Sequence, residues 1–361
     1  MSAKPLFLTR KFPPSVGGME TLAAGVWWTL SAAAPDSVLV AHRGANRSLP
    51  TWLPRALARM ARLAMRGRVD LVLTGDAVMY AAARPLLRFL RVPSATMVLG
   101  LDMTYRNRAY RAVVLSALRR ADLVVAISEA TAEVARNVGI APGRVHVVRL
   151  GVDAPEVTGE QRTEARSELN AKLGTTDEQV VLLTLGRLVR RKGTEWFLRD
   201  VLPQLPDPVI CVVAGDGREA DRVRAAVADL GLGRRVRLLG QVDDLDRELL
   251  LRGADMFVQP NVRIPGDIEG FGLVTIEAAM RGLPVVAADI EGLAEAVVDG
   301  VTGTLLPSGD AAAWIDRLTG LTADRERLAS QGPAFQRAAR ERYSERIMGD
   351  QLLRVLGLSN S

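Results

Sequence analysis

Short runs of apolar residues recur along the chain, separated by stretches with helical spacing. Continuous apolar runs are typical of strands in a parallel sheet, because helices cover both faces of such a sheet. In the first half we expect strands at Pro5–Leu8, Val38–Ala41, Leu71–Leu73, Ser94–Val98, Leu123–Ile127 and Val145–Val148. In the second half we expect strands at Val180–Leu185, Val209–Ala214, Val236–Leu239, Met256–Gln259, Pro284–Ala287 and Gly303–Leu305. The alternation predicts an α/β protein.

Helical periodicity fills the intervals, for example at Glu20–Ala32 and Ala109–Arg120. The 361 residues exceed what one hydrophobic core usually serves, so we expect two domains. The expected parts are an N-terminal Rossmann-like domain at 1–153, a linker and lead-in at 154–178, a C-terminal Rossmann-like domain at 179–335, and a helical segment at 336–361 packing back toward the first domain. Two doubly wound domains facing across a cleft would bind a ligand at the carboxyl ends of their strands.

Two glutamates separated by seven residues, Glu269 and Glu277, bracket the most informative segment. If a helix begins near Gly272, its first amides are unpaired and the glycine lets a ligand approach, which suits a diphosphate. Carboxylates accept hydroxyl protons, so the two glutamates suit a sugar and a ribose. The alternative leaves Glu269 in solvent and Glu277 on an outward helix face. A carboxylate inside the apolar run Leu273–Ala279 is costly unless it is satisfied.

A basic segment follows the expected strand Val180–Leu185 and carries Arg187 and, five residues later, Lys192. The planar guanidinium and the compact ammonium together suit phosphate oxygens, and a solvated basic turn is the alternative. Near the N-terminus, Gly17 and Gly18 stand between a strand and a helix. They indicate either backbone close to a ligand or a tight turn.

In their order, these segments resemble the family 4 glycosyltransferases. The resemblance rests on Pro-Pro-x-x-Gly-Gly-x-Glu at 13–20, Gly-Arg-Leu-x-x-x-Lys-Gly at 186–193, and the two glutamates around Gly-Phe-Gly at 269–277. Supporting matches lie at 127–129, 151–153, 214–217 and 297–303, so that the resemblance covers essentially the whole chain. It implies a GT-B fold, made of two Rossmann-like domains. The domain at 1–153 would then face the acceptor, and the domain at 179–335 would bind the nucleotide-sugar. It also implies a retaining enzyme that transfers a hexose from a nucleotide-sugar.

The resemblance implies catalytic positions at Arg187, Lys192 and Glu269. Arg187 and Lys192 would bind the diphosphate of the donor, Glu269 would contact the transferred sugar, and Glu277 would bind the ribose. The other implied donor-binding positions are Gly17, Gly18, Val242, Gly270, Phe271, Gly272 and Leu273. The family mechanism is front-face substitution, in which the departing phosphate takes the proton of the acceptor. We therefore expect no protein nucleophile, no metal and no cofactor, because cations and helix N-termini do the work of a metal.

One position departs from the family pattern. The family commonly has a histidine followed by glycine at the end of a first-domain strand, and here Leu99 precedes Gly100. A sugar contact from that histidine is therefore absent or passes to another group. Asp102 is our candidate for a contact on the acceptor side, and capping of the following helical segment is its alternative.

Charge and cysteine content bear on the surroundings of the protein. The formal net charge of +6 favours anionic ligands or an anionic surface, and the single Cys211 lies in an apolar run, which fits a reducing compartment. We expect a cytoplasmic enzyme without a membrane span. The segment Trp52–Arg68 places Arg55, Arg59, Arg62 and Arg66 along one helical stripe. It predicts either an ordinary surface helix or peripheral contact with the inner face of a membrane.

The expected partners are a nucleotide-sugar donor and a small-molecule or lipid-linked acceptor. Two other functions fit the same plan: a sugar-nucleotide epimerase of GT-B fold, and a non-catalytic nucleotide-sugar-binding protein. The first half has few general acid–base residues, which disfavours the epimerase. We expect no nucleic-acid partner, because few aromatic residues accompany the positive charge.

Overall fold

The computed structural model describes residues 3–15, 17–44, 46–105 and 107–359. They form two compact units, each with its own sheet. The first unit comprises Met1–Val152, Gly266–Phe271 and Tyr343–Ser361, and the second comprises Asp153–Pro265 and Gly272–Arg342. Residues 154–178 thus cluster with the second unit. The segment Gly266–Phe271 clusters with the first unit, so the boundary between the units falls between Glu269 and Glu277.

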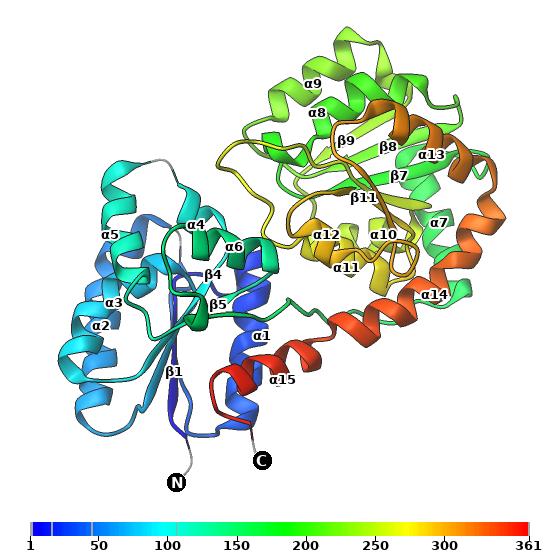
Figure 1. The fold of residues 1–361 in the computed structure, drawn as a ribbon. Helices are drawn as coiled ribbons and strands as arrows, with labels where there is room; N and C mark the ends of the chain where they lie inside the picture. The colour runs from blue at the N-terminus through cyan, green and yellow to red at the C-terminus, as the bar shows by residue number, and fades with distance from the viewer. Residues whose placement is uncertain (1–2, 16, 45, 106, 360–361) are drawn as a thin grey trace. The chain divides into compact units, whose positions relative to one another are not determined.

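The first unit is built on a parallel sheet in the order β2-β1-β3-β4-β5-β6 (Figure 1). Its strands are β1 (Pro5–Thr9), β2 (Val38–Ala41), β3 (Leu71–Thr74), β4 (Ser94–Val98), β5 (Leu123–Ala126) and β6 (Val145–Val147). Its helices are α1 (Gly18–Ala33), α2 (Leu49–Met65), α3 (Ala77–Leu90), α4 (Leu101–Thr104), α5 (Arg108–Leu118), α6 (Glu129–Asn137) and α15 (Glu345–Val355), with short 3-10 turns η1 (Asn46–Ser48) and η2 (Pro142–Arg144). Every residue of β1 and β4 is buried, because helices pack on both faces.

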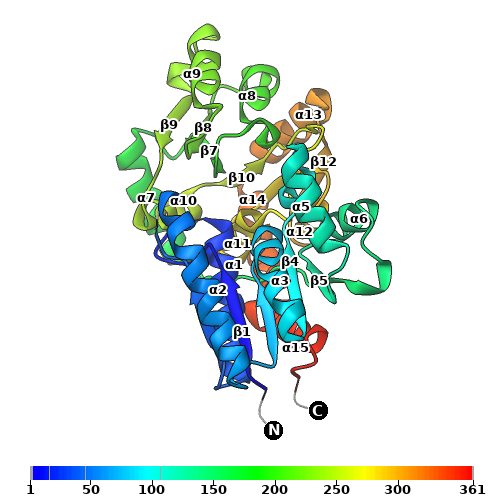
Figure 2. The same ribbon diagram turned by 90° about the vertical axis from the view of Figure 1, so that its left-hand side faces the viewer.

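Helices α2, α3 and α5 cover one face of this sheet, and α1 packs with α15 on the other (Figures 1 and 2). The apolar side of α2 joins the core through Ala56 and Met60, with Leu53 and Leu57 packed against it. The arginine stripe of α2 is exposed. This packing agrees with the interpretation of α2 as an ordinary surface helix, since its apolar side is already occupied.

The second unit repeats the plan in the order β12-β11-β10-β7-β8-β9. Its strands are β7 (Val180–Leu185), β8 (Val209–Ala214), β9 (Val236–Gly240), β10 (Met256–Gln259), β11 (Val285–Asp289) and β12 (Thr304–Pro307). Its helices are α7 (Gly159–Leu173), α8 (Thr194–Trp196), α9 (Ala220–Asp229), α10 (Asp244–Gly253), α11 (Leu273–Met280), α12 (Leu293–Ala296), α13 (Ala311–Ala323) and α14 (Arg325–Tyr343), with short turns η3 (Arg190–Lys192), η4 (Phe197–Val201), η5 (Leu202–Gln204) and η6 (Leu232–Arg234). Each strand pairs with its neighbours in parallel.

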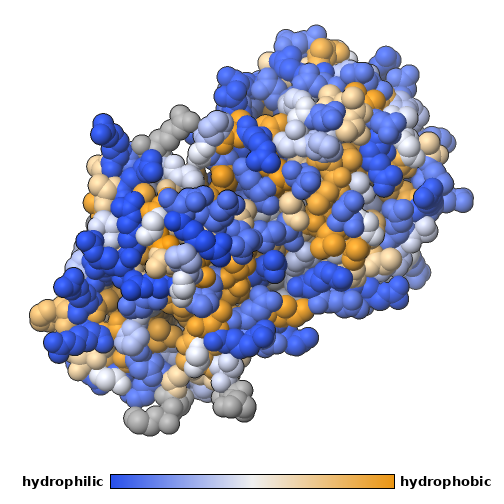
Figure 3. All heavy atoms as spheres, in the orientation of Figure 1, coloured by the Kyte–Doolittle hydropathy of each residue, from blue (hydrophilic) through white to orange (hydrophobic). Residues whose placement is uncertain are grey.

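The α/β class and the two Rossmann-like sheets predicted from the sequence are confirmed. All twelve expected strands are present, and their ends differ from the expected ones by at most two residues. Hydrophilic residues cover most of the face shown in Figure 3, with smaller apolar areas between them. Among the described residues, none of the helices has both the length and the apolar character needed to cross a bilayer.

Candidate active site

The predicted phosphate-binding residues of the second unit stand at the carboxyl edge of its sheet. Arg187 lies two residues beyond β7 with an exposed side chain, and Lys192 ends η3. Strands β7 and β10 are parallel neighbours, so their carboxyl ends share one edge. The segment from the end of β10 to α11 begins at that edge too. The sheet thus brings the two cations to the same side as the end of β10.

Glycines let the loops at this edge pack backbone against backbone. A β-carbon on Gly215 would lie 1.9 Å from the carbonyl oxygen of Gly186, and one on Gly217 would lie 2.2 Å from that of Leu188. Gly193 has φ 66°, and a β-carbon there would lie 1.8 Å from the carbonyl oxygen of Pro260. These contacts fix the loop that carries Arg187 and Lys192, because a larger residue would push it away.

Helix α11 begins where the sequence predicted, at Leu273, with Gly272 at its N-cap in the left-handed region (φ 90°). No side chain caps this start. Its amides therefore point outward with the positive end of the helix dipole, which is the geometry that binds a phosphate. Gly272 also lets Leu293 pack closely, since a β-carbon would lie 2.7 Å from the Leu293 Cδ1 atom.

Glu277 is the fifth residue of α11 and is half-buried, and Arg247 of α10 forms an ion pair with its carboxylate. The pair satisfies the carboxylate that sequence reasoning expected to be costly in an apolar run. Only the Oε2 atom of Glu277 takes part in this pair, so Oε1 keeps acceptor capacity for a hydroxyl group. Arg247 was missed from the sequence, because nothing in its own helix distinguishes it from other solvated arginines.

Val242 lies between β9 and α10 and is half-buried. The next residue, Asp243, caps α10 by accepting a hydrogen bond of 2.8 Å from the amide of Asp246. Val242 is therefore held at the carboxyl edge of the same sheet, beside the helix that supplies Arg247. Its role near the nucleobase stays a prediction.

In the first unit, the glycine pair stands at the start of α1. Gly17 is the N-cap with φ 155°, and both Gly17 and Gly18 are exposed. A β-carbon on Gly17 would lie 2.7 Å from the Glu20 carboxylate, so this turn needs glycine. Glu20 is buried and forms an ion pair of 3.3 Å with Lys11. The structure thus shows a tight turn with exposed backbone, which agrees with both interpretations of the pair.

Asp102 is half-buried and belongs to a cluster of polar groups at the carboxyl ends of β3 and β4. Its carboxylate accepts hydrogen bonds from the amides of Leu99 (3.1 Å) and Ala77 (3.4 Å). Asp76 is fully buried beside it and is paired with Arg10 at 2.8 Å. Burial and the Asp76 carboxylate raise the pKa of Asp102 to about 6. Asp102 therefore ties the loop after β4 to α3, and a contact with an acceptor stays a prediction.

Glu269 and its neighbours pack on the same loops of the first unit. Glu269 is buried (7% exposed). A β-carbon on Gly270 would lie 2.7 Å from the carbonyl oxygen of Leu99, and the Gly270 carbonyl accepts a hydrogen bond of 3.4 Å from Thr131. Phe271 is buried with its ring 6.1 Å from that of Tyr343. Position 99, where the family histidine is missing, therefore touches the predicted sugar-binding segment through its backbone.

The predicted residues thus fall into two groups. The second unit gathers Arg187, Lys192, Val242, Gly272, Leu273 and Glu277 at one sheet edge. The first unit gathers Gly17, Gly18, Asp102, Glu269, Gly270 and Phe271 at the corresponding edge of its own sheet. Sequence reasoning missed Arg247 and Asp76, although the position of Asp76, two residues after β3 and immediately before α3, was a usable signal.

Two family models match the chain. Residues 165–338 match "Glycosyl transferases group 1", and residues 28–155 match "Glycosyltransferase Family 4". The chain is 29% identical, over 97% of both chains, to the GDP-mannose-dependent alpha-(1-6)-phosphatidylinositol monomannoside mannosyltransferase of Mycolicibacterium smegmatis. It is also 34% identical to the phosphatidyl-myo-inositol mannosyltransferase of Mycobacterium leprae, over 57% of this chain and 54% of that enzyme. The latter match therefore spans about half of the relative.

Solved structures share the fold. HepE of Anabaena, in complex with UDP and glucose, superposes with a TM-score of 0.80 at 22% identity over 98% of this chain and 99% of that chain. The sucrose-phosphate synthase of Thermosynechococcus elongatus superposes with a TM-score of 0.78 at 20% identity over 98% of both chains.

The matched models, the relative that spans the whole chain and the two parallel sheets agree: this chain belongs to the family 4 glycosyltransferases of GT-B fold. It is a transferase, as the order of motifs predicted. The comparisons do not favour the epimerase or the non-catalytic binding protein.

Proposed function

We propose that this enzyme transfers a hexose from a nucleotide-sugar to an acceptor hydroxyl with retention of configuration and without a metal. One observation carries the proposal: Arg187 and the uncapped start of α11 stand at the same sheet edge as Glu277. Within the described part of the chain, the exposed Arg187 guanidinium makes no ion pair, so it is available to an anionic ligand. A guanidinium, helix amides and a carboxylate match the phosphates and the ribose of a nucleotide.

In the proposed front-face reaction, the bond between the anomeric carbon and the donor phosphate breaks as the acceptor oxygen approaches from the same side. The leaving phosphate oxygen takes the acceptor proton, so no protein nucleophile is needed. Negative charge develops on the diphosphate, where Arg187 and Lys192 would stabilise it. These two cations would do the work that a bound divalent metal does in other transferases.

The two glutamates would divide the remaining polar contacts. Glu277, oriented by Arg247, would accept protons from the ribose hydroxyls. Glu269 would contact the hydroxyls of the transferred sugar and stabilise positive charge as the anomeric carbon loses its bond. Exposed backbone at Gly17 and Gly18 would face the donor phosphate and the acceptor.

We propose GDP-mannose as the first donor to test and a phosphoinositol-bearing lipid as the first acceptor. The support is the activity by which the relative matched over 97% of the chain is named. Such an acceptor fits an enzyme at the cytoplasmic face of a membrane. Because α2 already packs its apolar side on the core, membrane contact through this helix would use its exposed arginine stripe rather than insertion.

A thermal-shift screen against GDP, UDP, dTDP and ADP, followed by their sugar forms, tests the donor site. A ligand present at 100 times its Kd should stabilise the protein by about 2.7 kcal/mol. Arg187→Gln should remove the shift, and Arg234→Gln serves as the matched control because Arg234 lies in η6, ahead of β9 at the opposite edge of the sheet. No shift with any of these nucleotides at millimolar concentration would contradict the donor site.

The reaction itself is tested with the nucleotide-sugar that shifts the melting temperature. Proton NMR of the first product formed should show the anomeric configuration of the donor retained, and addition of EDTA should leave the rate unchanged. An inverted product would contradict the front-face mechanism, and loss of activity in EDTA that is restored by Mg²⁺ or Mn²⁺ would contradict metal independence.

A further inference from the structure

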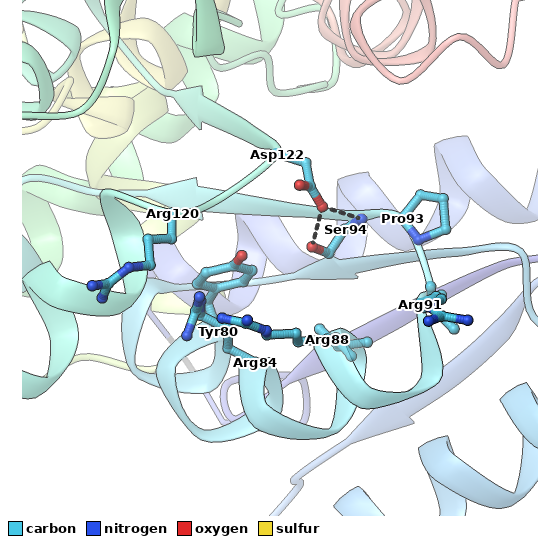
Figure 4. Close-up of a pocket in the computed structure, with 10 residues that line it drawn as sticks. Tyr80, Arg84, Arg88, Arg91, Pro93, Ser94, Arg120 and Asp122 are labelled. Atoms are coloured by element: carbon cyan, nitrogen blue, oxygen red, sulfur yellow. Dashed lines mark hydrogen bonds between the residues drawn. The ribbon is translucent and has the colours of Figure 1, made fainter.

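A pocket of about 440 Å³ opens at the amino ends of β4 and β5 in the first unit, far from the loops that carry the predicted active-site residues. Figure 4 shows Asp122 and Ser94 on one side, Tyr80, Arg84 and Arg88 on the other, and Arg91 and Arg120 toward its two ends. The volume lies in the range of ordinary small-ligand sites.

The charge of this pocket is strongly positive, because four arginines face one aspartate. Arg84 and Arg88 come from the last turns of α3, Arg91 is the residue that caps the C-terminus of α3, and Arg120 follows α5. Within the described residues, neither Arg88 nor Arg91 forms an ion pair. Arginines at a helix C-terminus also offset the helix dipole, but that effect does not require four of them to line one concave surface.

The carboxylate that lines this pocket already accepts hydrogen bonds within the protein. The Asp122 carboxylate accepts hydrogen bonds from the Ser94 amide (3.3 Å) and hydroxyl (2.9 Å) through a single oxygen, Oδ2. Its other oxygen can accept a proton from a hydroxyl group of a ligand. Tyr80 contributes a further donor: burial raises the pKa of its phenol, so the hydroxyl keeps its proton at neutral pH.

The pocket and the predicted active-site loops lie at opposite ends of the same strands. Ser94 begins β4, and Asp102 follows the other end of that strand by four residues. A five-residue strand is about 16 Å long, so a ligand in the pocket cannot touch the residues around Asp102. The donor-site residues of the second unit do not line the pocket either.

We propose that this pocket is a second binding site, which takes a phosphomonoester that also carries hydroxyl groups. The phosphate would bind Arg88 and Arg91, assisted by Arg84, because guanidinium groups match phosphate oxygens in pairs. A ligand hydroxyl would donate to Asp122. The same chemistry is found in a soluble sugar or glycerol phosphate and in the headgroup of an anionic lipid.

The test uses the full chain and the double variant Arg88→Gln/Arg91→Gln. Isothermal titration with glycerol 3-phosphate measures the soluble source. Flotation with phosphatidylcholine vesicles containing phosphatidic acid, compared with vesicles containing phosphatidylglycerol at equal charge, measures the lipid source. The matched control, Arg108→Gln/Arg111→Gln, removes the same charge from exposed positions of α5 in the same unit.

We expect one of the two phosphomonoester probes to bind wild type and the control with the same affinity. The double variant should bind that probe at least about tenfold more weakly. Glycerol 3-phosphate binding identifies a soluble ligand, and selective binding to phosphatidic acid vesicles identifies a headgroup. Tyr80→Phe should weaken the same binding by a smaller factor with the fold intact. Arg187→Gln should leave it unchanged, which separates this site from the donor site.

Three results would overturn the proposal. The first is no binding of either phosphomonoester by wild type. The second is an equal loss in the double variant and the control, which indicates general charge only. The third is a loss in Arg187→Gln without one in Arg88→Gln/Arg91→Gln, which places the phosphate at the donor site.

Discussion

The two sheets hold the polar groups at their carboxyl edges in different ways. In the first unit, the carboxylates of Asp76 and Glu20 are buried and paired with Arg10 and Lys11. In the second unit, Arg187 is exposed without an ion pair in the described structure, and the start of α11 has no side-chain cap. The buried carboxylates at the first edge are paired within the protein, whereas the second edge keeps a positive charge that an anionic ligand can bind.

The two arrangements have different effects: the buried ion pairs hold loops in place, and the exposed groups can bind a ligand. A buried ion pair holds loops in place but adds little affinity for a ligand, because its charges are already compensated. An exposed cation and uncapped amides exchange water for phosphate, so they contribute directly to binding. We therefore expect substitutions in the second unit to change nucleotide affinity. In the first unit, we expect them to change the rate of transfer or the stability of the fold.

The largest effect is expected at Glu269, the buried carboxylate of the first unit. Glu269→Gln keeps the shape and removes the charge, so kcat should fall about 100-fold while the Kd of the free nucleotide stays nearly unchanged. Steady-state rates and isothermal titration measure the two quantities, and circular dichroism checks the fold. An unchanged kcat would show that Glu269 only supports the loop.

Arg187→Gln should give the next largest effect. Loss of hydrogen bonds from a charged group to phosphate should weaken nucleotide binding by about 10-fold to 30-fold. Because the side chain is exposed, the melting temperature of the free enzyme should not change. Isothermal titration and thermal melting of the variant and the Arg234→Gln control measure both. A lower melting temperature with unchanged nucleotide affinity would show that Arg187 stabilises the fold and does not bind the nucleotide. That result would contradict the contrast between the two units.

Glu277 and Arg247 test whether the ion pair of the second unit serves binding. Glu277→Ala should weaken nucleotide binding about tenfold through loss of the ribose contacts. Arg247→Gln should weaken it less, since it only removes the group that orients the carboxylate. Titration with a nucleoside diphosphate and with pyrophosphate separates the roles, because pyrophosphate lacks the ribose. Equal nucleotide affinity in wild type and Glu277→Ala would contradict the ribose assignment.

The smallest effect concerns the pH dependence of stability through Asp102. Its pKa is about 6 in the folded protein and near 3.8 in the unfolded chain, so the folded state binds the proton more tightly. Stability should therefore decrease as pH rises, by roughly 1 kcal/mol between pH 5 and pH 7. Urea unfolding across this range should show the slope in wild type and a flatter one in Asp102→Asn. Identical slopes would remove Asp102 as the titrating group.

Much of the fold follows from local pattern. Each predicted strand is a run of apolar residues. In β8 every residue is buried, because both faces of the sheet are covered, and consecutive positions are therefore apolar. The start of α11 was predictable for a related reason, since Gly272 interrupts the chain just before an apolar helical run. Arg187 and Lys192 were likewise found from their place after a strand.

The remaining features join positions far apart in the chain. Arg247 pairs with Glu277 across thirty residues, and Arg10 pairs with Asp76 across sixty-six. Nothing local shows these pairings, because the sequence does not tell which distant arginine a carboxylate meets, even where the carboxylate itself stands out, as Asp76 does just before α3. The arginine pocket has the same origin, since α3 and its C-cap supply three of its arginines and the turn after α5 supplies the fourth.

The sequence by itself determined the positions of the strands and the order of motifs that is typical of the family. It also identified the segment from Glu269 to Glu277 as the most informative part of the chain. Periodicity and glycine positions are local properties, so they can be read directly from the order of the residues. The tertiary structure decided that this segment crosses from one unit to the other, that Glu277 is paired, and that Asp102 lies beside Asp76. Those facts depend on which strands become neighbours, and strand order is set by packing of the whole sheet rather than by any one run of residues.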